Sequence, residues 1–147
     1  MNQELFKRRT QDYALRIIRL TTALPNNAPC RVVGGQVLRA GTSVGANDRA
    51  ACRAKSRADF ISKMGTVEEE CDESLYWMEI LIGAGFLSAK RAAALMQEGT
   101  EILALTVSSI KEIIGCHKFS MVRICQIITV VNSERGCMCH SIWGHCS

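Results

Sequence analysis

The sequence predicts an all-α protein: an antiparallel up-down-up-down four-helix bundle followed by a C-terminal tail of different character. Apolar residues recur at alternating steps of four and three in four successive segments, which is the pattern of bundle helices. Proline or glycine interrupts the chain at 25–29 and 83–85, and such short connections place neighbouring long helices antiparallel. The periodicity is lost after residue 115. We therefore predict a bundle over residues 1–115 and a distinct tail over residues 116–147.

The first two helices are expected over residues 3–24 and 29–51. Pro25 ends the first because its ring disfavours helical geometry in the residue before it, and Pro29 suits the first turn of the second. The first apolar stripe consists of Phe6, Thr10, Tyr13, Ile17, Leu20 and Leu24. The second stripe consists of Val33, Val37, Ala40, Val44, Asn47 and Ala51. The second helix also contains Gly34, Gly35, Gly41 and Gly45. So many small residues predict that a neighbouring helix packs closely against it.

The third helix is expected to begin at Ser56, with Asp59 three residues later, because both side chains can accept hydrogen bonds from the first N–H groups of a helix. It should end at 83–85, where a glycine can adopt the left-handed conformation. Its apolar stripe consists of Phe60, Met64, Val67, Cys71, Leu75, Met78 and Ile82. The fourth helix is expected from Ser88 to Gly115. Its stripe consists of Ala92, Met96, Gly99, Leu103, Thr106, Ile110 and Ile113.

Charge is distributed unevenly along the chain. Residues 1–57 contain eleven Lys or Arg and three Asp or Glu, whereas residues 58–115 contain four and ten. The net charge of the whole chain is only +4. A basic half and an acidic half indicate either complementary packing, within or between copies, or a basic face that binds an anionic partner.

Four short motifs occur in the order typical of one protein family. Residues 38–47 resemble the signature R-A-x-x-S-x-x-x-N, and residues 56–63 resemble S-x-x-D-F-I-x-K. Residues 70–79 resemble E-A-x-E-S-x-x-W-L-E, and residues 85–87 resemble a G-x-L turn. These motifs are similar to those of the four-helix bundle proteins encoded in 23S rRNA intervening sequences. The resemblance covers about residues 5–115.

This resemblance implies an antiparallel bundle that assembles into a ring-shaped homopentamer without catalytic activity. A related branch, the accessory protein of diversity-generating retroelements, is a basic pentamer that partners a reverse transcriptase and binds nucleic acid. The expected partners are therefore other copies of the chain, RNA or DNA, and a reverse transcriptase. Asp48 departs from the family, whose members often carry an aromatic or aliphatic residue there. The tail has no counterpart in the family.

The best candidate for a functional surface is the basic turn after the second helix. It consists of Arg49, Arg53, Lys55 and Arg57, together with Arg39 earlier in the same helix. Such side chains neutralise phosphates and release counterions, so binding to nucleic acid should fall steeply with salt. No aromatic residue is interleaved among them, which favours sequence-independent contact with the backbone over base stacking. The alternative is that these arginines pair with the acidic third helix of the same or a neighbouring copy.

The bundle segment shows no pattern typical of an enzyme. No histidine precedes His117, so the Glu-x-x-His pairs of a di-metal bundle are absent. Cys71 lies on an apolar stripe, where a buried, unreactive thiol is the expected role. The glycines match neither a Walker A loop nor a dinucleotide fingerprint. We predict no catalytic residue, no cofactor and no metal site.

The tail contains five of the eight cysteines and all three histidines. Residues 137–140 and 145–146 offer side chains that zinc prefers, but in an unfamiliar order. We favour a disordered segment or an extension added by a shifted stop codon.

The sequence contains no apolar run long enough to span a bilayer and begins without the apolar core of a signal peptide. We expect a cytoplasmic protein with no membrane partner.

Overall fold

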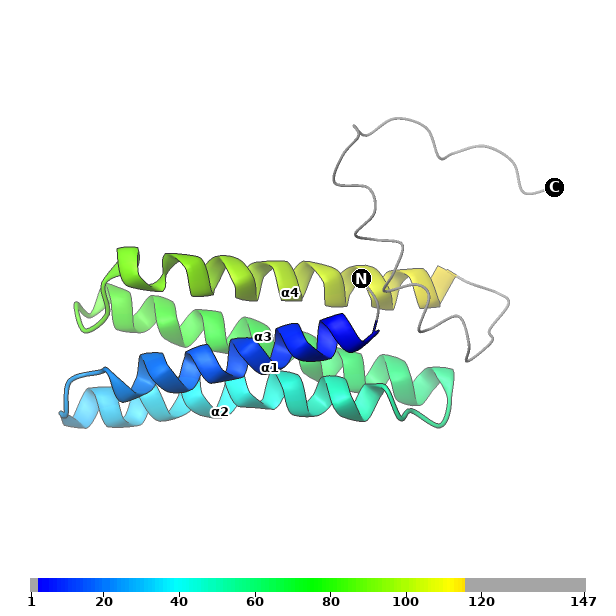
Figure 1. The fold of residues 1–147 in the computed structure, drawn as a ribbon, viewed down its shortest axis with the longest axis horizontal. Helices are drawn as coiled ribbons and strands as arrows, with labels where there is room; N and C mark the ends of the chain where they lie inside the picture. Colours follow the sequence, from blue (N-terminus) through cyan, green and yellow to red (C-terminus); the bar gives the residue numbers. More distant parts are fainter. Residues whose placement is uncertain (1–2, 116–147) are drawn as a thin grey trace, which may run out of the picture.

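The computed structural model describes residues 3–115 and shows four α-helices and no strand in that part of the chain. The helices are α1 (Gln3–Thr22), α2 (Ala28–Ala51), α3 (Arg57–Gly83) and α4 (Ala89–Gly115). They lie alongside one another, with the α1–α2 and α3–α4 connections at one end and the α2–α3 turn at the other (Figure 1). The predicted four-helix bundle is confirmed. The predicted tail, residues 116–147, lies outside the described residues.

The helices follow one another around the bundle in chain order. α2 packs along both α1 and α3, and α4 packs along α3, whereas α1 and α4 share the smallest contact. The α1/α2 pair and the α3/α4 pair therefore form opposite sides of the molecule. All four helices bury apolar side chains between these pairs, and each large one contributes about 1.5–3 kcal/mol by leaving water. The largest fully buried apolar side chains are Phe6, Tyr13, Ile17, Met64, Met78, Leu81 and Ile102.

Polar side chains set the predicted helix starts. The side chain of Asn27 accepts a hydrogen bond from the Cys30 N–H at 2.8 Å at the start of α2. At the start of α3, Ser56 Oγ accepts from the Asp59 N–H at 3.1 Å, and the Asp59 carboxylate accepts from the Lys55 N–H at 2.9 Å. These acceptors satisfy N–H groups that have no partner within the helix. The predicted capping pair at Ser56 and Asp59 is confirmed.

A glycine ends α3 as predicted. Gly85 has a φ of 77°, a left-handed conformation that side chains other than glycine rarely adopt. The Phe86 N–H donates to the Leu81 carbonyl at 3.0 Å, and the Gly85 N–H donates to the Ile82 carbonyl at 2.9 Å. This pair of bonds is a Schellman motif, which turns the chain and delivers the buried Leu87 to the core.

Glycines let α1 and α2 approach closely, as the small residues predicted. A Cβ atom at Gly41 would lie 2.7 Å from Ile17 Cγ1, and one at Gly45 would lie 3.4 Å from the Thr10 carbonyl oxygen. No side chain at Gly41 fits without displacing the β-branched Ile17, whose χ1 is stiff. Gly35 faces the other way and has no atom within 4 Å of its Cβ position.

The predicted stripe of α2 is wrong at one position. Asn47 was expected in the core, but the structure buries Asp48 instead and leaves Asn47 half-buried. The Asn47 side chain donates to the Ser43 carbonyl at 3.0 Å within its own helix. Asp48 faces α1, where the Thr10 hydroxyl donates to its carboxylate at 3.2 Å. A hydrogen-bond partner 38 residues away makes this burial tolerable.

The predicted stripe of α4 lies closer to α3 than the residues that the structure buries. Met96, Leu103 and Ile110 were expected at its centre, but they are only partly buried and pack against the edge of the core. The buried residues of α4 are Ala92, Leu95, Gly99, Ile102, Leu105, Thr106, Ser109 and Ile113. The apolar arc of α4 is wider than one stripe, so two stripes fit the same sequence.

Polar contacts complete the seam between α1 and α4. The Arg9 guanidinium pairs with both Glu98 and Glu101 of α4. Inside the bundle, the Tyr13 hydroxyl lies 2.8 Å from Ser74 Oγ of α3.

Between residues 3 and 115, no helix combines the length and apolar character needed to cross a bilayer.

Candidate functional site: a basic hollow and an acidic groove

A hollow of about 610 Å³ lies between the first half of α1 and the last turn of α2. Because the two helices are antiparallel, the start of α1 meets the end of α2, and basic residues from both gather there. The hollow is lined by Gln3, Glu4, Lys7, Arg8, Gln11, Arg49, Cys52 and Arg53. We refer to this surface as the basic hollow.

The cations of the basic hollow are only partly compensated. Lys7 pairs with Glu4 at 2.8 Å, a contact that raises the pKa of the lysine and lowers that of the glutamate. Arg49 donates to the neutral Gln11 side chain at 2.9 Å and makes no ion pair within residues 3–115. Within residues 3–115, the side chain of Arg8 makes neither a hydrogen bond nor an ion pair, and the same holds for Arg53. The hollow therefore presents a net positive charge.

The structure brings together two of the five residues predicted to bind nucleic acid. Arg49 and Arg53 line the basic hollow. Lys55 lies beyond them on the α2–α3 turn, with its side chain exposed.

The other two predicted residues make structural contacts elsewhere. Arg39 lies against α3, with Nη1 3.3 Å from Glu70 and Nη2 2.5 Å from Glu73. Arg57 donates to the last carbonyls of α4, including that of Ile114 at 2.6 Å. Arg39 therefore follows the alternative interpretation of the sequence, pairing with the acidic third helix of the same copy.

Sequence reasoning missed Lys7 and Arg8 as members of this surface. Both lie off the apolar stripe of α1, which marks them as surface residues but does not say which helix they adjoin. The available signal was the antiparallel pairing of the first two helices, which places the start of one beside the end of the next.

A second surface on the opposite side carries the opposite charge. A hollow of about 450 Å³ lies between α3 and α4, and we refer to it as the acidic groove. Its lining residues are Gly65, Glu68, Glu69, Asp72, Leu103 and Val107. Among residues 3–115, no cation pairs with any of these three carboxylates. The groove therefore combines uncompensated negative charge with apolar walls.

Asp48 is a buried carboxyl group next to the basic hollow. Only 2% of the residue is exposed, and burial raises its pKa to about 6 although the Thr10 hydroxyl, Lys7 and Arg49 act in the other direction. Thr10 Oγ1 also lies 3.1 Å from the Lys7 carbonyl oxygen. One hydroxyl proton serves only one of these two acceptors, whereas a protonated Asp48 supplies a second proton. The hydrogen-bond geometry and the burial of Asp48 therefore both favour the protonated, neutral form of its carboxyl group.

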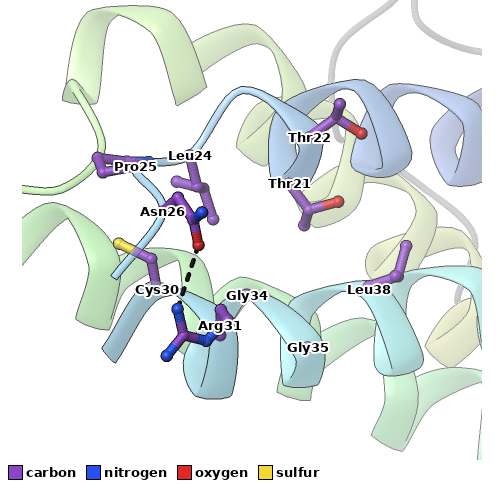
Figure 2. A pocket seen from close by; sticks show the side chains of 10 residues that line it. All are labelled: Thr21, Thr22, Leu24, Pro25, Asn26, Cys30, Arg31, Gly34, Gly35 and Leu38. Atoms are coloured by element: carbon purple, nitrogen blue, oxygen red, sulfur yellow. Dashed lines mark hydrogen bonds between the residues drawn. The ribbon is translucent and has the colours of Figure 1, made fainter. Parts of the chain in front are cut away.

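A third hollow, of about 370 Å³, lies at the α1–α2 turn (Figure 2). Its lining is mostly small and uncharged, with Gly34 and Gly35 on the α2 side. Its one cation, Arg31, donates to the Asn26 side chain at 3.1 Å. This hollow therefore lacks the concentrated charge of the other two surfaces.

The described residues offer little for catalysis. The Cys71 thiol donates to the Gly99 carbonyl at 3.2 Å, and burial raises its pKa to about 12, so it stays a thiol at neutral pH. Between residues 3 and 115, no three His, Cys, Asp or Glu side chains are placed to hold a metal ion.

The fold and its surfaces define a class of four-helix bundle with one basic and one acidic side. The family model described as 23S rRNA-intervening sequence protein matches residues 4–108, so the chain belongs to this family and the predicted resemblance is confirmed. A crystal structure of a protein of unknown function from the S23 ribosomal protein family of Bacteroides thetaiotaomicron is similar, with a TM-score of 0.69. The two sequences are 37% identical over 76% of this chain and 99% of that one. Among curated proteins, no match is found.

Proposed function

We propose that this protein is a non-catalytic building block that assembles into a homopentameric ring and acts as a scaffold in the cytoplasm. One observation carries the proposal: the outer face of the α1/α2 pair exposes an apolar row. Leu15 and Ile18 are one helical turn apart on α1 and are 44% and 42% exposed, and Leu38 of α2 is 38% exposed. Leu38 lines the same hollow as Thr22, which is one turn from Ile18. A contact with a second copy would remove this row from water.

The oligomeric state tests this proposal directly. We expect light scattering of the purified chain to give five times the mass of one copy, and Ile18→Asp/Leu38→Asp to lower it. Val32→Asp is the matched control, because Val32 is more exposed, at 67%, but lies outside the row. A wild-type chain that remains monomeric at micromolar concentration contradicts the proposal.

A second candidate function is sequence-independent binding of RNA or DNA. The observation that favours it is the α2–α3 turn, where the exposed side chains of Arg53 and Lys55 make no ion pair within residues 3–115. In a ring, each turn is repeated in every copy, which raises avidity for a long polyanion. Such a surface suits the accessory subunit of a reverse transcriptase, the alternative function that the family resemblance implies.

Titration with labelled RNA and DNA at several salt concentrations tests this candidate. We expect affinity to fall steeply with salt, and Arg53→Ala/Lys55→Ala to weaken binding of all sequences alike. Lys90→Ala/Arg91→Ala, at the start of α4, is the control for the loss of two exposed cations. Absence of binding at low salt rules the candidate out. Co-purification with a reverse transcriptase distinguishes the accessory role from a general scaffold.

A further inference from the structure

The basic hollow and the acidic groove lie on opposite sides of one molecule. The hollow belongs to α1 and α2, the groove belongs to α3 and α4, and these pairs face away from each other across the core. Opposite charges on opposite sides cannot neutralise each other within one copy. They are placed instead to meet across a contact between copies.

The two surfaces also lie at about the same height along the bundle. Arg9, next to Arg8 of the basic hollow, contacts Glu101 of α4. Glu101 is two residues from Leu103, which lines the acidic groove. A neighbouring copy that is rotated about an axis parallel to the helices therefore brings its groove to the level of the hollow.

Both surfaces also have apolar side chains beside their charged ones. Leu103 and Val107 form the apolar wall of the groove. On the other side, the apolar row of Leu15, Ile18 and Leu38 continues along α1 and α2 from the basic hollow. Leu103 and Val107 lie near the level of Glu101 and Arg9, whereas Leu15 and Ile18 lie toward the α1–α2 end of the bundle. The two surfaces therefore match at one level through their charges, which give an interface specificity.

We infer that the acidic side chains lining the groove of one copy pair with the basic side chains lining the hollow of the next copy. This inference rests on the proposed homopentamer and assigns the surfaces through which it assembles. The contact joins two different surfaces, so an open chain of copies has a free hollow at one end and a free groove at the other until a ring closes. The α2–α3 turn lies at the end of the bundle (Figure 1). Arg53 lines the hollow and also lies on this turn, so self-assembly and binding of a polyanion share this residue, whereas Lys55 lies outside the hollow.

Charge reversal on each surface tests the inference. The hollow variant is Arg8→Glu/Arg49→Glu, and the groove variant is Glu69→Arg/Asp72→Arg. All four side chains are exposed, so the helices should fold, which circular dichroism checks. We expect each variant alone to lose the assembly, with the mass in light scattering falling fivefold. Lys90→Glu/Arg91→Glu is the matched control and should keep the wild-type mass.

A chain with all four substitutions provides the decisive measurement. Its hollow is acidic and its groove is basic, so the two surfaces again complement each other. We therefore expect light scattering to give the mass of five copies again. If single-surface variants keep the wild-type mass, the inference is wrong while the homopentamer stands. The same holds if the hollow variant keeps its mass but loses RNA and DNA affinity, because the hollow would then be a nucleic-acid site. If the chain with all four substitutions fails to assemble, the inference that the two surfaces pair through opposite charges is also rejected. A monomeric wild-type chain would instead contradict the homopentamer itself.

Discussion

The two helix pairs of this bundle achieve the same fold by different means. α1 and α2 approach through glycines, so their contact depends on the absence of side chains at positions such as Gly41. α3 and α4 pack mainly through larger side chains and have one close glycine, Gly99, whose Cβ would lie 2.9 Å from Leu75 Cδ2, whereas Gly65 of α3 has open space around its Cβ position. The α1/α2 pair also contains the one buried carboxyl group within residues 3–115, that of Asp48. We conclude that the first pair tolerates fewer changes than the second, although both bury a continuous apolar face.

Of the three changes that test this comparison, Gly41→Leu should have the largest effect on stability. The new Cβ would lie 2.7 Å from Ile17 Cγ1, and the stiff isoleucine cannot yield without moving α1. Overpacking of this kind costs about 3 kcal/mol or more, which chemical denaturation measures. Gly65→Ala and Gly35→Ala are the controls, and each should stabilise the protein by up to about 1 kcal/mol through helix propensity. Equal effects at Gly41 and Gly65 would remove the distinction between the pairs.

Asp48→Asn should sharpen the comparison through pH. The folded protein retains the Asp48 proton up to about pH 6, whereas an ordinary aspartate releases it near 3.8, so this group loses stability as the pH rises through that window. The loss amounts to about 2–3 kcal/mol once both states are ionised. We therefore expect the stability of Asp48→Asn relative to wild type to improve by that amount between pH 4 and pH 7.5.

The same relative measurement separates Asp48 from carboxylates whose pKa is lowered, such as Asp59 and Glu73. Those groups lose stability as the pH falls, and they contribute equally to wild type and variant. A pH-independent difference between the two proteins would show that Asp48 titrates normally.

Arg9→Ala should have the smallest effect of the three. It removes the pairing with Glu98 and Glu101 at the seam between α1 and α4, where the side chains are partly screened by water. We expect a loss of about 1 kcal/mol in thermal unfolding, decreasing at high salt. Arg16→Ala is the control, since Arg16 on α1 makes no ion pair within residues 3–115. A loss that does not respond to salt would indicate packing of the arginine stem instead of charge.

The sequence predicted those features that depend on neighbouring residues. Ser56 and Asp59 cap a helix across three positions, and Gly85 ends one by its own conformation, so both could be read locally. The choice between Asn47 and Asp48 could not, because it depends on Thr10 in another helix. In α4 the sequence alone could not choose between two overlapping apolar stripes.

The candidate site shows the same division. Arg49 and Arg53 were visible as a cluster in sequence, whereas Lys7 and Arg8 join them only because α1 and α2 are antiparallel. Arg39 belongs to the same cluster in sequence, yet its position on the α3 side of α2 commits it to Glu70 and Glu73. The homopentamer and the nucleic-acid partner stay predictions, because a single copy contains neither.

The sparse seam between α1 and α4 has a consequence for motion. Three of the four neighbouring helix contacts are extensive, and the fourth depends on Arg9 and a few side chains such as Tyr13. We therefore expect the first local opening to move α1 away from α4 about its contact with α2, which would expose Tyr13 and Gly99 while α2 and α3 stay packed. Native-state hydrogen exchange should then show longer protection for the central amides of α3 than for those of α1. The contact between α1 and α2 would act as the hinge of this opening.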